Sequence, residues 1–501
     1  MSRLLVLPIA LPLATAALSF LAAGKPMLQR AISLAGSLGL LGVAILLTRA
    51  VWRESVLVVQ VGDWPAPYGI TLVADPLSAV MVLIAAVIGL AVTVYSLADL
   101  PPRTDMFGYH SLLQCLIGGV CGAFLTGDLF NLYVWFEVAL IASFALLVFG
   151  GTKLQLDGAV KYVALNLVGT IAFLIAIGLL YGLTGTLNMA DLHLKVKQVE
   201  DVGHLTVVAV LFIFAFGIKS AVFPLFFWMP ASYHTPPAAV SAVFAGLLTK
   251  LGVYSLIRLF TLVFTQDTGY THTVMLWVAA LTMITGVLGA AAQNEFRRIL
   301  AFHSVSQIGY MLLGLALYTP LALAGATFYM LHHSLVKANL FLVSGVASRM
   351  AGSFELDQLG GLYRQRPWLA FYFFLSAFSL AGFPPFSGFW AKFVLVKASV
   401  VIEHYAVAGI ALAVGLLTTY SMTKIWDLAF WKSRPTTAGP WPAPLSTAHQ
   451  WLLLAPVGLL AVLTLVLGLW AGPILELALR AGEQLMDPSD YVRMVLHRSP
   501  S

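Results

Sequence analysis

Long apolar stretches alternate with short polar loops along almost the whole chain. Stretches of about 18 or more apolar residues can cross a bilayer as helices, and this sequence contains about fourteen of them. The pattern therefore predicts an all-α polytopic membrane protein. The first stretch follows Arg3 without a convincing cleavage site, so we interpret it as a true span rather than a removed signal peptide. Approximate limits of the spans are 4–23, 28–49, 75–98, 108–126, 129–150, 159–183, 204–228, 238–260, 272–292, 300–318, 321–347, 368–400, 404–426 and 450–472.

Three segments outside these spans have patterns of their own. Residues 52–75 contain the β-favouring run VLVVQVG followed by Pro65 and Pro67, which predicts a short strand or hairpin outside the membrane. Residues 186–201 are typical of an amphipathic surface segment, and the tail after Trp470 is short and of mixed charge.

The composition agrees with a membrane protein. The chain has 501 residues, of which 60% are hydrophobic and 10% charged, whereas a soluble domain carries about 25% charged residues. The net charge of +6 is spread over loops without a basic run, which favours membrane orientation over nucleic-acid binding. Cys115 and Cys121 lie in one apolar segment and indicate neither a disulfide framework nor a metal site.

The basic residues of the loops predict an orientation in the cell membrane. Loops after odd-numbered spans carry roughly twice the Lys and Arg of the other loops, so the positive-inside rule puts them in the cytoplasm and both termini outside. Lys195 and Lys197 oppose this assignment. The supporting residues include Lys25, Arg30, Lys153, Arg297, Arg298, Arg364, Arg366, Lys432 and Arg434.

Proline interrupts two of the spans. Pro224 lies within GIKSAVFPLFFWMP of the seventh, and Pro384 and Pro385 lie within SLAGFPPFSGFWAKF of the twelfth. Similar breaks in two halves of a chain indicate a transporter with internal repeats. Because the breaks are five spans apart, an odd number, the second repeat must be inverted relative to the first. The alternative is a pair of incidental kinks, which membrane helices tolerate.

The helix breaks also predict freed backbone groups. Proline removes an amide donor and clashes with the carbonyl four residues earlier, so the carbonyls of Ser220, Leu380 and Ala381 lose their helical partners. Such groups persist at membrane depth only when they are buried in protein or face a wet cavity.

Three charged residues lie deep within spans of the first half. Glu137 is the only acid in such a position, Lys219 lies one turn before Pro224, and Lys250 is near the middle of the eighth span. A charge near the bilayer centre costs about 2.5–3.5 kcal/mol on insertion scales, which marks it as a functional candidate. The end of a half-helix stabilises the ammonium of Lys219 and burial opposes it, so a neighbouring charge such as Glu137 could load or unload its proton.

The second half continues the series. His333 and Lys337 are four residues apart and share a helix face, with His332 turned roughly 100° away. Lys392 follows the second break by one to two turns. Histidine titrates near neutrality and suits a relay between lysines.

A secondary relay is also predicted near the start of the tenth span. His303 lies there beside Ser304, and His332 belongs to the same secondary set. The alternative for the histidines is a purely structural interhelical hydrogen bond, and for the lysines a set of unconnected salt bridges. Three further lysines lie near span ends and are interpreted as interfacial, namely Lys161, Lys397 and Lys424.

Two runs carry a resemblance to a known family. FGIKSAVFPLFFWMPASYHTPPAAVSAVFAGLLTKLGVYSLIR and HHSLVKANLFL with GFPPFSGFWAKF strongly resemble the proton-conducting antiporter-like family. This family comprises the large subunits of Mrp-type Na⁺/H⁺ antiporters and the membrane-arm subunits of respiratory complex I. The resemblance extends from about residue 76 to residue 431 and implies fourteen helices with inverted five-helix repeats. The expected divisions are 1–107 (helices 1 to 3 with the loop 52–75), 108–260 (first repeat), 272–426 (inverted second repeat) and 450–501 (helix 14 and tail).

The resemblance also implies roles for the buried residues. The fifth-helix glutamate of the family corresponds to Glu137, the lysine before the seventh-helix break to Lys219 and the eighth-helix lysine to Lys250. The His-xxx-Lys of helix eleven corresponds to His333 and Lys337, and the charged residue of broken helix twelve to Lys392.

Within the family, the segments VGDWPAPYGITLVADPLSAVM and TGDLFNLYVWFEV resemble the D-type subunits of Mrp antiporters. The tail is too short for the lateral helix of the L-type complex I subunit, and the chain is too short for an A-type Mrp subunit. Lys392 departs from the M-type complex I subunit, where glutamate is usual, but is compatible with the N-type.

These resemblances imply a function for the chain in a larger assembly. We expect it to move protons along the membrane midplane, without a cofactor or a metal, while Na⁺ crosses elsewhere in the complex. Its expected partners are a larger A-type paralogue, small membrane subunits, protons, Na⁺ and lipid. One alternative is a proton-pumping subunit of a respiratory or hydrogenase-type redox complex, whose redox centres would lie in other subunits. The other alternative is a structural membrane scaffold with degenerate sites, and the presence of charged residues at all the key positions argues against it.

Overall fold

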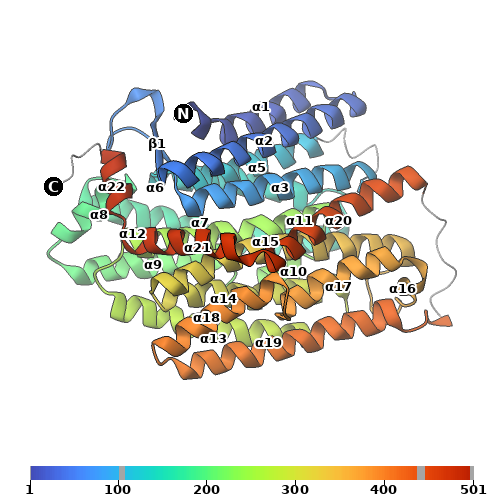
Figure 1. Cartoon of the computed structure of the whole chain (residues 1–501). Coiled ribbons are helices and arrows are strands. Elements are labelled where there is room, and N and C mark those ends of the chain that lie inside the picture. The colour runs from blue at the N-terminus through green and yellow to red at the C-terminus, as the bar shows by residue number, and fades with distance from the viewer. Residues whose placement is uncertain (1, 101–107, 437–445, 497–501) are drawn as a thin grey trace.

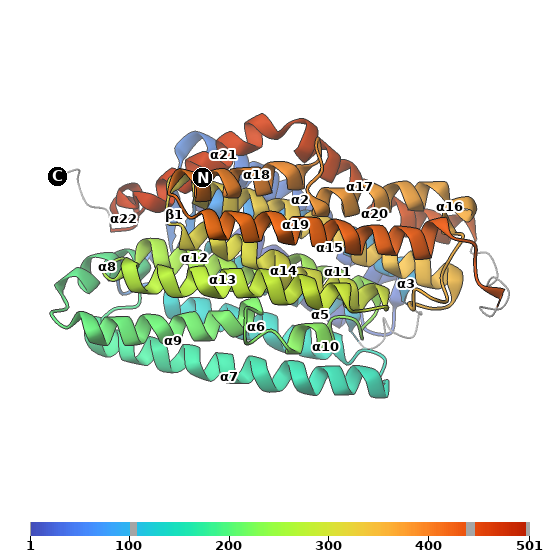
Figure 2. The same ribbon diagram turned by 90° about the horizontal axis from the view of Figure 1, so that it is seen from below.

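Helices running roughly along one axis make up most of the computed structural model of this chain, which describes residues 2–100, 108–436 and 446–496 (Figures 1 and 2). Ten of the described helices are long and apolar enough to cross a membrane, and three further apolar helices are shorter. With α15, which has 32 residues and many polar side chains, they form the predicted fourteen crossings. The prediction of an all-α polytopic fold is confirmed.

Seven of the described helices form the first seven crossings, and the seventh crossing contains the first break. They are α1 (Leu7–Leu21), α2 (Pro26–Glu54), α3 (Pro76–Asp99), α5 (Tyr109–Leu125), α6 (Leu129–Leu147), α7 (Lys153–Thr184) and α9 (Val202–Ser220), which continues after the break as α10 (Trp228–Ser232). The later crossings begin with α11 (Ala238–Val243), a π-helical segment (Phe244–Leu248) and α12 (Thr249–Leu262), which together form one span. The remaining ones are α13 (Thr268–Ala291), α14 (Phe296–Ala316), α15 (Pro320–Ala351), α17 (Pro367–Ala381) with α18 (Ser387–Val401), α19 (Tyr405–Ile425) with a π-helical end (Trp426–Trp431), and α20 (Thr447–Leu469). The short α16 (Leu362–Gln365) precedes α17.

The two predicted helix breaks are present. α9 ends at Ser220 and α17 at Ala381, each followed by a residue in the left-handed backbone region, Ala221 (φ 60°) and Gly382 (φ 97°). Each break is the fourth crossing of a set of five, as an inverted repeat requires. The π-helical segment in the eighth span was not predicted, because nothing in the hydropathy pattern distinguishes it from an α-helix.

A small hairpin marks one end of the bundle, which we call the hairpin face. β1 (Leu57–Gln60) pairs antiparallel with β2 (Thr71–Ala74), so the hairpin predicted within residues 52–75 is confirmed, and its location outside the membrane stays a prediction. The short helix α8 (Met189–Lys195) confirms the surface segment predicted for 186–201 and lies at the same end (Figure 1). The terminal helix α22 (Ser489–Leu496) joins them, because Gln60 Nε2 donates to the carbonyl of Val495 at 3.1 Å.

The chain after Trp470 contains more structure than its mixed charge suggested. α21 (Ala471–Met486) is an amphipathic helix that packs along α15, where Gly482 closely approaches the backbone of Pro320. At the junction of α20 and α21, Gly468 lies against the second break, since a Cβ there would come within 2.5 Å of the Pro385 carbonyl oxygen. The end of α20 therefore lies beside the break in the twelfth span.

A buried ion pair ties the start of α3 to the end of α12. Asp75 Oδ2 lies 2.6 Å from Arg258 Nη1, and both side chains are almost fully buried. The same carboxylate caps α3, because its Oδ1 accepts from the amide of Ser78 at 2.9 Å. Breaking a buried pair by neutralising one partner costs more than breaking an exposed pair, because it leaves an uncompensated charge in a low-dielectric site.

We predict that Asp75→Asn destabilises the folded chain by about 3–5 kcal/mol. Asparagine is as good a helix cap as aspartate, so this substitution tests the ion pair rather than the cap. The exposed pair of Asp157 and Lys161 provides the control, and Asp157→Asn should change stability by less than about 1 kcal/mol. Thermal unfolding of the purified complex in detergent measures both, and equal stabilities of the two variants would contradict the prediction.

Candidate functional site

The first predicted charge pair is joined through a threonine of α7. Lys219 Nζ, in the last turn of α9, donates to Thr170 Oγ1 at 2.8 Å and to the carbonyl of Asn166 at 3.0 Å. The Thr170 hydroxyl in turn donates to Glu137 Oε1 of α6 at 2.9 Å. Lys219 is 5% exposed, whereas Glu137 is only partly buried at the surface of the isolated chain. The carboxylate is thus within electrostatic range of the ammonium and linked to it by one hydroxyl.

Lys250 lies directly after the π-helical segment. It is fully buried, and its Nζ donates to the carbonyl of Ala245 within that segment. A π-helical turn displaces the regular backbone ladder and is frequent at functional sites. Here it offers a carbonyl oxygen to an ammonium on the next turn.

Lys250 and Lys219 come from helices in close contact. Gly252 of α12 faces the end of α9, and a Cβ at this position would come within 2.3 Å of Ser220 Oγ and 3.0 Å of the Lys219 carbonyl carbon. Only a residue without a side chain allows this approach, so glycine brings the helix of Lys250 against the break that holds Lys219.

The histidine–lysine pair of α15 follows next. Lys337 is fully buried and its Nζ donates to the carbonyl of Leu300 in α14 at 2.8 Å. Ser304 Oγ donates to the same carbonyl at 3.1 Å, which places Ser304 beside Lys337. His333 lies within electrostatic range of Lys250, Lys337 and His303, and so connects Lys250 of α12 to the charged groups of α14 and α15.

At the second break, Lys392 binds the two carbonyls that the sequence predicts to lack helical hydrogen-bond partners. Lys392 Nζ donates to the carbonyl of Leu380 at 3.0 Å and to that of Ala381 at 2.9 Å. Its ammonium lies 5.3 Å from the centre of the Tyr310 ring. Pro384 and Pro385 cannot supply the amides that would occupy these two oxygens in a continuous helix.

His332 points to the second break as well. Its Nδ1 lies 2.8 Å from Ser387 Oγ, and Ser387 Oγ lies 2.9 Å from Ser379 Oγ. Ser387 opens α18 and Ser379 lies in the last turn of α17, so this short chain of hydroxyls spans the gap between the two half-helices.

Polar atoms without a protein partner accumulate between Lys250 and Lys392. Buried polar groups in proteins are nearly always bonded to protein or to ordered water. Among the described residues, fully buried side chains with at least one unpartnered nitrogen or oxygen include Thr249, His303, Gln307, His332, His333, Ser334 and Asn339. These residues come from α12, α14 and α15, and their number favours a hydrated line through the protein. In the part of the chain that the structure describes, no three His, Cys, Asp or Glu side chains are grouped to hold a metal ion.

A family of membrane proteins matches the region that contains these residues. The family model described as "NADH:quinone oxidoreductase/Mrp antiporter, TM" matches residues 126–418, more than half of the chain. The chain belongs to this antiporter-like family. It is 46% identical over 496 residues to the D-type Na⁺/H⁺ antiporter subunit of Alkalihalophilus pseudofirmus, covering 99% of this chain and all of the relative. It is 40% identical to the corresponding D-type protein of Bacillus subtilis, with the same coverage. The predicted resemblance to D-type subunits is confirmed.

Two solved structures agree with the fold. A chain of the Mrp complex from Dietzia sp. superposes with a TM-score of 0.91 and 35% identity, over 99% of this chain and all of that chain. A chain of an archaeal membrane-bound sulfane sulfur reductase gives the same TM-score and coverage with 26% identity.

Several contacts of this antiporter-like chain were not predicted from its sequence. Asn166 and Thr170, four residues apart in α7, hold Lys219, and Ser379 and Ser387 flank the second break. Asn166 and Thr170 could have been predicted, because two polar residues four positions apart within an apolar span lie on one helix face. No periodic signal marks the serines, because they meet only across the break.

We predict that Thr170→Val lowers antiport by roughly tenfold, since valine keeps the shape but removes the hydroxyl that links Glu137 to Lys219. Thr170→Ser keeps the hydroxyl and should retain most of the activity. Thr464→Val is a matched control, because Thr464 is also buried but donates only to its own helix at Leu460. Cation-dependent proton exchange in everted vesicles provides the measurement, and full activity of Thr170→Val would show that the hydroxyl link is dispensable.

Proposed function

We propose that this chain is the proton-translocating D-type subunit of a multisubunit Na⁺/H⁺ antiporter of the cell membrane. The observation that carries the proposal is a line of lysines and histidines joined by unpartnered polar groups, in which Lys250, His333 and Lys337 are fully buried and Lys392 is partly buried. Buried ionisable residues in a membrane span are expensive and characteristically mark proton or ion pathways. A passive scaffold would have no need of them.

Each lysine of this line is held by backbone carbonyls rather than by a carboxylate. Carbonyl dipoles stabilise an ammonium without pairing it with a formal charge, so the lysine can give up its proton without leaving an anion behind. In the proposed mechanism a proton received by Lys250 moves through His333 and Lys337 to Lys392. A membrane potential of 100 mV contributes about 2.3 kcal/mol per charge moved, which biases such steps by more than tenfold.

Glu137, Thr170 and Lys219 act as the switch in this mechanism. While the carboxylate stays near, it favours the protonated form of Lys219, and when it withdraws the lysine releases its proton more readily. The Thr170 hydroxyl accepts from the ammonium and donates to the carboxylate, so it transmits the state of one to the other. Glu137 is partly exposed on the isolated chain, and we propose that it faces a neighbouring subunit, because a carboxylate facing lipid at this depth is costly.

The proposed complex is an antiporter rather than a redox pump. Support comes from the two full-length D-type relatives of Na⁺/H⁺ antiporters, at 46% and 40% identity, against 26% for the chain of the sulfane sulfur reductase. The expected partners are a larger A-type paralogue and small membrane subunits, with Na⁺ crossing in another subunit. The repeat limits 108–260 and 272–426, and the placement of both termini and the hairpin face outside, belong to the same proposal.

We predict that Glu137→Ala or Lys219→Ala lowers antiport by about tenfold or more without loss of assembly, because each removes one end of the switch. Lys161→Ala serves as the control, since Lys161 is exposed and pairs only with Asp157. Antiport in everted vesicles and co-purification of the other subunits are measured together. Retained activity in either variant would remove that residue from the mechanism.

The assignment to an antiporter has a separate test. The chain is tagged in its own host and extracted in mild detergent, and the co-purifying proteins are identified by mass spectrometry. Small membrane subunits and a larger paralogue are expected, while iron–sulfur or flavin subunits in the particle would overturn the assignment.

A further inference from the structure

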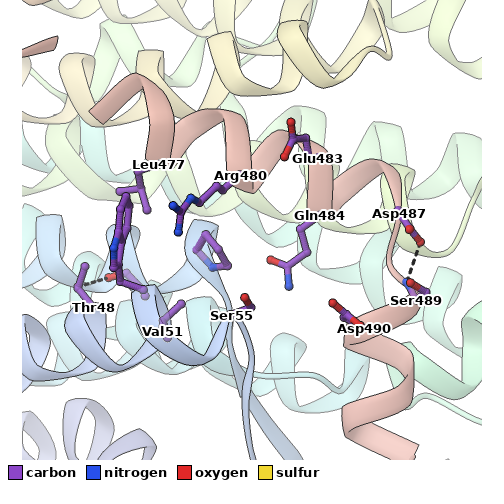
Figure 3. Close-up of a pocket in the computed structure, with 13 residues that line it drawn as sticks. Thr48, Val51, Ser55, Leu477, Arg480, Glu483, Gln484, Asp487, Ser489 and Asp490 are labelled. Atoms are coloured by element: carbon purple, nitrogen blue, oxygen red, sulfur yellow. Dashed lines mark hydrogen bonds between the residues drawn. The ribbon is translucent and has the colours of Figure 1, made fainter. Parts of the chain in front are cut away.

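A cavity of about 310 Å³ lies between the ends of α2 and α3 and the two C-terminal helices, away from the line of buried lysines. Figure 3 shows Arg480 and Leu477 reaching from α21 toward α2, with Gln484 beside them and Asp490 of α22 at the far end. The inner wall is apolar, formed by Val51, Leu477 and Ala79. One side of this cavity is therefore suited to hydrocarbon and the other to charge.

The charges around the cavity are of both signs but unequal in number. Arg480 is the only cation among the described lining residues, which also include three carboxylates, Glu483, Asp487 and Asp490. Of these, Asp490 is already paired with Arg493 of α22, so Glu483 and Asp487 leave the cavity with a net negative charge. Arg480 lies over the ring of Trp52 at 4.2 Å and is already paired with Glu476 at 2.7 Å. A guanidinium has five N–H donors, so it retains donors for a second acceptor. The cavity can thus bind one anionic group at Arg480, but its net charge favours a cation nearby.

Apolar surface continues from the cavity along the membrane-spanning helices. On α2, Ile45 and Leu38 lie seven and fourteen residues before Trp52, on the same helix face, and are 38% and 52% exposed. On α3, Leu83, Val87 and Leu90 form a partly exposed stripe in an otherwise buried helix, beginning one turn beyond Ala79. Trp52 itself is typical of the boundary between hydrocarbon and headgroups. The two stripes extend from the cavity toward the membrane centre, as acyl chains do from a headgroup.

We propose that this cavity binds a phospholipid with a primary-amine headgroup, of the phosphatidylethanolamine class, in the leaflet at the hairpin face. The phosphate is held by Arg480 and the ammonium by Asp487 and Asp490, while the acyl chains follow the stripes of α2 and α3. A primary ammonium donates up to three hydrogen bonds to carboxylates, which a quaternary choline cannot do. An anionic headgroup is disfavoured because it would add negative charge beside three carboxylates.

This proposal does not depend on the transport mechanism, and its readout is lipid content rather than activity. The intact complex is purified in mild detergent, and its bound lipids are counted by native mass spectrometry. The double variant Asp487→Asn with Asp490→Asn should retain on the order of fivefold less phosphatidylethanolamine than the wild type. Asparagine at 487 can still accept the hydrogen bond from the Ser489 amide, so the turn before α22 is maintained. Asp63→Asn, an exposed carboxylate of the hairpin loop that does not line the cavity, should retain wild-type lipid.

A second measurement identifies the occupant directly. A photo-crosslinking residue at position 45 in the assembled complex should label phosphatidylethanolamine. Delipidated complex offered vesicles of phosphatidylethanolamine, phosphatidylcholine or phosphatidylglycerol should rebind the first in preference. Equal lipid retention by all variants, equal rebinding of the three lipids, or crosslinking of position 45 to another protein subunit would each overturn the proposal.

Discussion

An ammonium buried at membrane depth must find oxygen atoms inside the protein, and in this chain it finds backbone carbonyls. Lys219 reaches the carbonyl of Asn166, Lys250 that of Ala245, Lys337 that of Leu300, and Lys392 those of Leu380 and Ala381. A regular helix uses its carbonyls for its own ladder and has few to spare. The π-helical segment and the second break supply the carbonyls that bind Lys250 and Lys392, whereas Lys219 and Lys337 share carbonyls of the regular helices α7 and α14.

The charges near the ends of the spans are arranged differently. Asp75 pairs with Arg258, Asp99 with Arg349 and Glu295 with Arg297, at separations of 2.6, 3.4 and 3.3 Å. All three pairs neutralise charge, and the first two also join α3 to α12 and to α15, whereas Glu295 and Arg297 both lie at the start of α14. Among the described ion pairs, none involves Lys219, Lys250, Lys337 or Lys392, and Glu137 is linked to Lys219 only through the Thr170 hydroxyl. Fixed pairs at the ends of the spans and lysines without fixed partners at the centre are the arrangement that the proposed proton transfer requires.

Close contacts between helices at glycine residues stabilise the two breaks and the helices around them. A Cβ at Gly388 would lie 1.8 Å from the Ser379 carbonyl oxygen and 2.9 Å from His332 Nε2, so the second break can close around the histidine only with glycine there. Gly252 likewise allows α12 to approach the end of α9 at the first break, and Gly468 allows the end of α20 to approach Pro385. Small residues at helix interfaces permit close approach in membranes, where packing rather than hydrophobicity drives association.

The number of crossings, the two proline breaks and the odd spacing that inverts the repeat could all be predicted from the amino-acid sequence. So could the unusual position of Glu137, Lys219, Lys250, Lys337 and Lys392 in apolar surroundings. These are local properties, because hydropathy, proline chemistry and the cost of a buried charge depend on a few neighbouring residues. The packing of the helices was needed to show that Thr170 lies between Glu137 and Lys219, that the eighth span contains a π-helical turn, and that the serines of α17 and α18 lie beside His332. The formation of α21 and α22 by the tail is likewise a tertiary outcome. These outcomes depend on which helices become neighbours, and residues far apart in the chain carry no periodic sign of meeting.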